Sequence, residues 1–130
     1  MKVLLVSSDP DIREQLAVTL RSLEGVTGEP VEFLRAEDGL VGAKLAWKRA
    51  PDVVVADEIT GRMGAFALTL ELKGAEHPFP GVVVILLERP QDAWLAEWAG
   101  ADGWFVKPIN PFDLANAVAA SLSRRIEEAV

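Results

Sequence analysis

Short apolar runs alternate along this chain with longer segments in which apolar residues recur at helical spacing. Five runs rich in β-branched residues predict strands at 2–7, 31–36, 52–57, 82–87 and 103–107. Helical patterns cover 10–24, 38–49, 64–75, 91–99 and 111–128. Runs without a polar residue, such as VVVILL at 82–87, suit strands that are buried on both faces of a parallel sheet. The alternation therefore predicts an α/β fold, a doubly wound sheet of five parallel strands with helices on both faces.

Capping residues mark where the first and last of these helices begin. In Asp9-Pro10-Asp11 an N-cap acceptor precedes a proline at the first helical position, and an acid follows near the positive end of the helix. Asn110-Pro111 repeats the arrangement before the last helix. Since that helix is expected to run to the end of the sequence, we expect residues 1–130 to form a single domain with no output domain after it.

The amino-acid composition and the net charge argue against several classes of function. The net charge of −7 argues against nucleic-acid binding, which needs clustered lysine and arginine. The absence of cysteine excludes disulfides and thiolate sites, and His77, the only histidine, is expected to be a solvated loop residue. The apolar runs are too short to span a bilayer, and no signal peptide is recognisable, so we expect a cytoplasmic protein that does not contact membranes.

Polar residues gather at the carboxyl ends of three predicted strands, the edge where open α/β sheets bind ligands. They are Ser7, Ser8 and Asp9 after the first strand, Asp57 and Glu58 at the third, and Lys107 at the fifth. An isolated aspartate at such a place often only caps a turn. Here a lysine followed by Pro108 ends another buried strand, which favours a functional role for Asp57.

Three segments resemble the receiver domain of bacterial response regulators, the CheY-like domains of two-component signalling. They are VSSDPDIRE at 6–14, PDVVVADEITGRMGAF at 51–66 and GADGWFVKPINPFDL at 100–114, and the resemblance extends over essentially the whole chain. It implies a flavodoxin-like sheet in the strand order 2-1-3-4-5, with Asp57 and Lys107 close together at its carboxyl edge. It also implies a function in phosphorelay signal transduction, without enzymatic activity beyond phosphorylation and dephosphorylation of the domain itself.

The resemblance implies a role for each residue that matches the family's motifs. Asp57 corresponds to the aspartate that accepts a phosphoryl group from a histidine kinase. Lys107 corresponds to the lysine that senses the phosphoryl group, and the proline after it is usually cis. Trp104 corresponds to the aromatic switch, where tyrosine or phenylalanine is more usual.

The sequence departs from the family at the metal and hydroxyl positions. Ser7 and Ser8 fall where the family has the pair of acids that hold Mg²⁺. The threonine or serine of the fourth strand should fall near Ile85, Leu86 or Leu87, which are all aliphatic. The turn after the acceptor usually reads Met-Pro-x-Met-Asp-Gly, and here it reads TGRMGA at 60–65.

These departures predict weak Mg²⁺ binding or none, because Mg²⁺ needs several hard oxygen ligands. The backbone carbonyl of Ile59 could serve as a ligand, as it does in the family. Asp9 and Glu58 lie one residue from the usual ligand positions, and Asp9 already has a sufficient role as an N-cap. We therefore expect an atypical receiver that acts through protein–protein interaction, and the alternative is a receiver that is phosphorylated on Asp57.

The partner surface of receivers is usually formed by the fourth helix, fifth strand and fifth helix. In this chain that region begins DAWLAEWAGADGWFVK at 92–107 and holds three of the four tryptophans. We expect Trp98 to point outward and to anchor a homodimer or another protein partner, such as a kinase. Trp94 is expected to fill the core, and Trp47 is expected to serve packing.

A second class of function is a flavodoxin-like protein that binds FMN or another phosphate ligand in the same crevice. Such a site favours a glycine-rich first loop that offers backbone N–H groups to an anion. The loop SSDPDIRE at 7–14 has hydroxyls but no glycine, and its acids would repel an anion. The chain also lacks the G-x-G-x-x-G pattern of dinucleotide-binding proteins.

Overall fold

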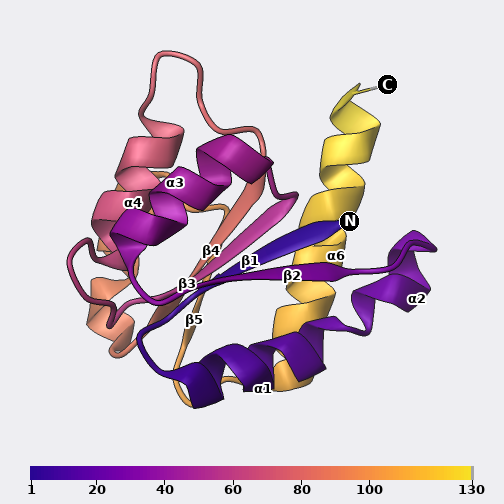
Figure 1. Cartoon of the computed structure of the whole chain (residues 1–130), viewed down its shortest axis with the longest axis horizontal. Helices are drawn as coiled ribbons and strands as arrows, with labels where there is room; N and C mark the ends of the chain where they lie inside the picture. Colours follow the sequence, from indigo (N-terminus) through magenta and orange to yellow (C-terminus); the bar gives the residue numbers. More distant parts are fainter. Residues whose placement is uncertain (130) are drawn as a thin grey trace.

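The computed structural model describes residues 1–129 and shows the predicted sheet (Figure 1). All strands are parallel and lie in the order β2-β1-β3-β4-β5, which confirms the predicted fold. The strands are β1 (Lys2–Val6), β2 (Glu32–Ala36), β3 (Val53–Asp57), β4 (Val82–Leu87) and β5 (Gly103–Val106). This order places the carboxyl ends of β1 and β3 side by side, with β4 and β5 next in line.

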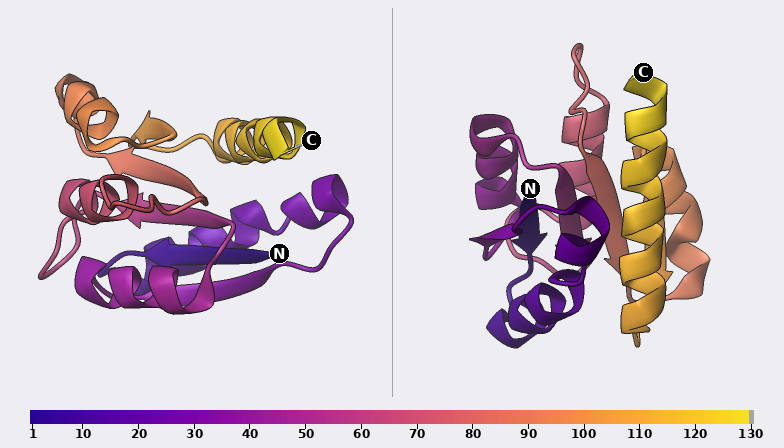
Figure 2. Two further views of the ribbon diagram at one scale, coloured as in Figure 1. Left: turned by 90° about the horizontal axis from the view of Figure 1, so that it is seen from above. Right: turned by 90° about the vertical axis from the view of Figure 1, so that its right-hand side faces the viewer.

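Helices cover both faces of the sheet (Figures 1 and 2). They are α1 (Pro10–Leu20), α2 (Leu23–Thr27), α3 (Gly39–Arg49), α4 (Ala65–Lys73), the 3₁₀ turn η1 (Pro90–Asp92), α5 (Ala93–Ala99) and α6 (Pro111–Ala129). The single helix predicted over 10–24 is wrong, because α1 ends at Leu20 and a short α2 follows. The Ser22 hydroxyl donates to the carbonyl of Thr19, a local bond that competes with continuation of the helix, and the turn buries Leu23 fully.

Alternation along the central strands divides the hydrophobic core into two. Val3 and Leu5 point to the face covered by α1, α2 and α6, and Leu4 and Val6 point to the face covered by α3, α4 and α5. Every residue of β3 and β4 is buried, as the unbroken apolar runs predicted. A sheet covered in this way leaves its edges and strand ends as the places where polar chemistry meets solvent.

Both predicted helix caps are confirmed. The carboxylate of Asp9 accepts a hydrogen bond of 2.8 Å from the N–H of Asp11, and the side-chain oxygen of Asn110 accepts one of 2.9 Å from the N–H of Phe112. Each cap starts its helix a few residues after a strand. The caps therefore set the direction in which the chain leaves the carboxyl edge of the sheet.

The prediction that Trp94 fills the core is wrong. Its side chain is 64% exposed and that of Trp98 is 66% exposed, so the predicted outward position of Trp98 is confirmed. The reason is that α5 has only seven residues and turns Ala96 and Ala99 inward, which leaves Trp94 and Trp98 one turn apart on its outer side. Trp47 is also partly exposed, although its ring packs edge-on against Phe79 with 6.0 Å between the ring centroids.

His77 lies exposed in the loop between α4 and β4, as expected. Among the helices of residues 1–129, none has the length and apolarity that a membrane crossing would need.

Candidate functional site

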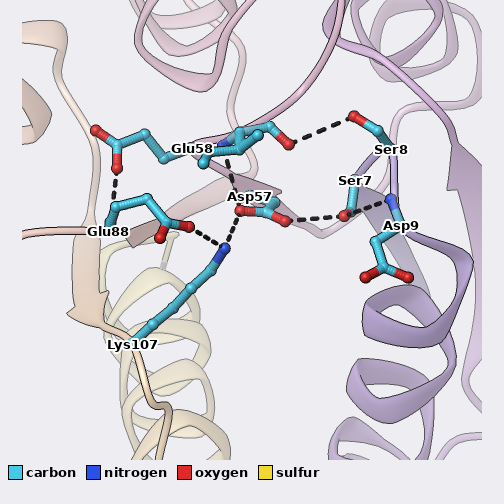
Figure 3. A network of polar contacts seen from close by, with 8 residues as sticks. Ser7, Ser8, Asp9, Asp57, Glu58, Glu88 and Lys107 are labelled. Atoms are coloured by element: carbon cyan, nitrogen blue, oxygen red, sulfur yellow. Dashed lines mark hydrogen bonds and ion pairs between the residues drawn. The ribbon is translucent and has the colours of Figure 1, made fainter.

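Asp57 is the last residue of β3, and its side chain is 2% exposed. One carboxylate oxygen, Oδ1, accepts a hydrogen bond of 2.6 Å from Nζ of Lys107 and one of 3.3 Å from the N–H of Ile59 (Figure 3). The other, Oδ2, accepts a hydrogen bond of 2.9 Å from the hydroxyl of Ser7. The structure thus brings Asp57 and Lys107 together as the fold prediction requires, and it engages both oxygens of the carboxylate.

Lys107 follows β5 and is joined to Pro108 by a cis peptide bond. Its ammonium is shared between two carboxylates, those of Asp57 and Glu88. Partial burial opposes the positive charge, but the hydrogen bonds and charges of Asp57 and Glu88 outweigh this effect and raise the pKa of Lys107. The lysine is therefore a fixed cation in this site.

The two serines tie the loop after β1 to β3. Ser7 is fully buried, and its hydroxyl donates to Asp57 while it accepts a hydrogen bond of 3.1 Å from the N–H of Asp9. Ser8 is exposed and donates a long hydrogen bond of 3.4 Å to the carbonyl of Ile59. Hydroxyls therefore contact the carboxylate of Asp57 and the loop after it, at the positions where the family resemblance implies acids.

The candidate substitute metal ligands are engaged elsewhere. The carboxylate of Asp9 caps α1, and that of Glu58 accepts a hydrogen bond of 2.6 Å from the N–H of Glu88. Both carboxylates point away from Asp57 (Figure 3). Within the described residues there is no group of three or more acidic or imidazole side chains that could hold a metal ion. With an ammonium on Oδ1 of Asp57 and a hydroxyl on Oδ2, this set of donors does not fit Mg²⁺.

The end of β4 carries no hydroxyl. Ile85, Leu86 and Leu87 are all buried, with Ile85 and Leu87 in the same core as Trp104 and Leu86 in the core on the opposite face. Ile85 is the register partner of the half-buried Trp104 on β5. The aromatic ring therefore packs on aliphatic neighbours.

Sequence reasoning missed Glu88 and Arg13. Glu88 directly follows β4 and contacts Lys107, and Nη1 of Arg13 donates a hydrogen bond of 2.6 Å to the carbonyl of Ser7. The rule that singled out Asp57 and Lys107, a polar residue at the end of a buried strand, would also have found Glu88. No such signal marks Arg13, which lies on the first helix.

A second polar cluster holds the loop between β3 and α4 against the start of α3. Arg62 forms an ion pair of 2.8 Å with the buried Asp38, and the N–H of Gly39 donates to the hydroxyl of Thr60. The loop approaches so closely that a Cβ on Gly39 would lie 1.9 Å from the carbonyl oxygen of Met63. The N–H of Val41, which Asp38 caps, and then the Arg62 guanidinium lower the pKa of Asp38, although burial opposes them.

No family model matches the chain. Over 127 residues the chain is 28% identical to the DNA-binding response regulator MtrA of Mycolicibacterium smegmatis, with 98% of this chain and 53% of the relative covered. The chain spans about half the length of the curated relatives it matches.

Solved structures that are similar to the chain are also receiver and chemotaxis response-regulator proteins. The receiver domain of a signal transduction histidine kinase from Syntrophus aciditrophicus is 28% identical, with a TM-score of 0.77 over 95% of this chain and 90% of that chain. The chemotaxis protein CheY4 of Vibrio cholerae is 27% identical, with a TM-score of 0.70 over 95% of this chain and 96% of that chain. The chain thus has the CheY-like flavodoxin fold, and the relatives and solved structures it is similar to are response regulators and receiver domains. In this chain the strand-end aspartate and lysine are present, and serines stand beside them.

Proposed function

We propose that this receiver domain is an atypical member of two-component signalling that acts mainly through protein–protein contacts rather than through Mg²⁺-dependent phosphorylation. The observation that carries the proposal is the engagement of Asp57. Its carboxylate is buried and accepts hydrogen bonds from Ser7, Ile59 and Lys107, and the carboxylates of Asp9 and Glu58 point away from it.

The chemistry of phosphoryl transfer explains why this arrangement disfavours the reaction. Catalysis depends on positioning and on neutralising the charge around the transferred group, and a metal ion usually carries the largest share. Here Lys107 is the cation beside Asp57, and it already pairs with two carboxylates. The missing hydroxyl at the end of β4 removes a charge-assisted hydrogen bond as well, worth roughly 1.5–3 kcal/mol.

The surface of α5 supports a function in docking. Trp94 and Trp98 are both mostly exposed and lie on the outer side of the helix. We propose that this helix, with β5 and α6, binds a protein partner or a second copy of the chain, with Trp98 as an anchor. A dimer through one such patch should be two-fold symmetric, because each copy presents the same surface.

The alternative function is that of a receiver that accepts a phosphoryl group on Asp57 from a histidine kinase. The contact between Asp57 and Lys107 favours it, since it matches the arrangement that the family resemblance implies. DNA binding, which the name of the relative MtrA states for that protein, is not proposed for these residues, because their net charge is −7.

Incubation with acetyl phosphate, with and without Mg²⁺, separates the two proposals. In the reaction an oxygen of Asp57 attacks phosphorus, the bond to the acetate oxygen breaks, and acetate leaves with the electron pair. Intact-mass measurement should show little or no phosphoryl adduct on the wild type and no effect of Mg²⁺. A Mg²⁺-dependent adduct that is absent from Asp57→Asn would support the alternative and contradict our proposal.

A further inference from the structure

The ammonium of Lys107 lies between the carboxylates of Asp57 and Glu88 (Figure 3). Lysine has three N–H donors, so these two contacts occupy most of its capacity. Asp57 is buried, whereas the side chain of Glu88 is 37% exposed and lies on the solvent side of the site. A ligand that approaches Lys107 from solvent therefore has to compete with the carboxylate of Glu88.

Glu58 fixes Glu88 in this place. The N–H of Glu88 donates to Oε2 of Glu58 at 2.6 Å, and the N–H of Glu58 donates to the carbonyl of Leu86 at 2.9 Å. The ends of β3 and β4 are thus linked in both directions. The link restrains the backbone of Glu88, from which its side chain extends to Lys107 (Figure 3).

Charge and hydrogen bonding together exclude anions from this edge of the sheet. An oxyanion that approaches Asp57 meets two further carboxylates, those of Glu58 and Glu88. It also finds that two of the three N–H donors of Lys107 and the backbone N–H of Glu88 are already in use. Only the third N–H of Lys107 could bind it without breaking a charge-assisted hydrogen bond, and any further contact would have to displace a carboxylate.

We propose that Glu88, held by Glu58, is an internal competitor for Lys107 that closes the site beside Asp57 to phosphate-like oxyanions. This inference rests on the proposed function and deepens it, because it gives a second reason for weak phosphoryl chemistry besides the serines. It also explains why a lysine is useful here without phosphorylation. Lys107 joins the ends of β3, β4 and β5 through carboxylates of the chain itself.

The test is a titration of the whole domain with inorganic phosphate, followed by the amide resonances of residues 59, 88 and 107. Sodium chloride at matched ionic strength corrects for screening. The variants are Glu88→Gln, Glu58→Gln and, as a control with the same change in charge, Glu71→Gln at an exposed position on α4. A combined Glu88→Gln and Lys107→Met variant shows whether any gained affinity depends on the lysine.

We expect Glu88→Gln to lower the apparent dissociation constant for phosphate about tenfold, the scale of one charge-assisted contact. Glu58→Gln should give a smaller gain, Glu71→Gln none, and Lys107→Met should remove the gain. An equal effect of Glu88→Gln and Glu71→Gln, or no effect of either glutamine at the site, would overturn the proposal. Glu58→Gln provides the test if Glu88→Gln does not fold.

The phosphate titration tests the role of Glu88 separately from the proposal that the chain is an atypical receiver. If phosphate binding is unchanged in Glu88→Gln while the acetyl phosphate assay still shows no adduct, the competitor fails and the atypical receiver stands. If wild type forms a Mg²⁺-dependent adduct, the atypical receiver fails, and the phosphate titration still decides the role of Glu88.

Discussion

The hydroxyl of Ser7 donates a hydrogen bond of 2.9 Å to Oδ2 of Asp57, and both side chains are almost completely buried. A carboxylate at the end of a parallel strand needs such donors when it is removed from water. In this chain the serine that follows β1 and the lysine that follows β5 supply them. The contact therefore makes Ser7, at a position where the family resemblance implies a metal-binding acid, part of the internal packing of the sheet.

Ser7→Ala should destabilise the domain. The change removes one donor to a buried carboxylate, which costs roughly 1–3 kcal/mol of the free energy of unfolding. Ser8→Ala is the matched control, because Ser8 is exposed and makes only a long hydrogen bond, so its effect should be at most about 0.5 kcal/mol. Urea unfolding followed by circular dichroism measures both, and equal effects of the two changes would contradict this role for Ser7.

Mg²⁺ should bind the wild type weakly or not at all, and replacing both serines by aspartate should create a site. The hydroxyl of Ser7 already lies 2.9 Å from Asp57, so acids at positions 7 and 8 would add carboxylate oxygens beside Asp57. Titration followed by amide shifts should show saturation below about 1 mM only for the Ser7→Asp/Ser8→Asp variant. Saturable binding of that strength to wild type, centred on Asp57, would mean that Asp9 or Glu58 had become a ligand.

Asp38 should make the stability of the domain depend on acid pH. Its pKa is lowered in the folded state, chiefly by the N–H of Val41, from a usual value of 3.8. Such a group contributes stability above pH 3.8 that is lost as the pH falls through its lower, folded-state pKa. Asp38→Asn keeps a capping oxygen and removes the titration. Thermal unfolding at a series of pH values should therefore show a flatter acid limb for the variant, and parallel curves would contradict the prediction.

The sequence predicted those parts of the molecule in which local chemistry and the fold agree. Unbroken apolar runs predicted strands buried on both faces at β3 and β4, and the family resemblance implied the strand order that brings Asp57 and Lys107 together. Asp9 and Asn110 marked helix starts because a capping side chain bonds only to its own chain nearby. The buried strands and the helix caps depend on few distant contacts, so the linear pattern is sufficient to predict them.

Features that depend on distant contacts were not predictable in the same way. Trp94 was placed in the core because it is large and apolar, but the small inward surface of α5 is filled by Ala96 and Ala99. The end of β4 marks Glu88 as a candidate, but its contact with Lys107, nineteen residues away, arises only from the pairing of β4 with β5. The sequence pattern shows which residues are polar, but the contacts between polar residues that are distant in the sequence depend on the fold.

Trp98 on α5 should control association of the domain. Burial of one such ring supplies a few kcal/mol, enough for micromolar association when surrounding contacts help. Trp98→Ala should therefore weaken self-association or partner binding at least about tenfold, on the scale of an interface anchor. Trp47→Ala removes another partly exposed tryptophan from α3 and should leave association unchanged. Sedimentation velocity over a concentration series measures the effect.

Asp57→Asn separates the docking proposal from its phosphorylation alternative in the same experiment. Since the patch of Trp94 and Trp98 lies on the outer side of α5 and Asp57 is buried at the end of β3, the change should leave the mass distribution as it is in wild type. An unchanged distribution for Trp98→Ala would remove Trp98 from the interface. Loss of association in Asp57→Asn, with Trp98 intact and the fold unchanged by circular dichroism, would show that the chemistry of Asp57 controls assembly. That result would contradict a docking module that works independently of the acceptor.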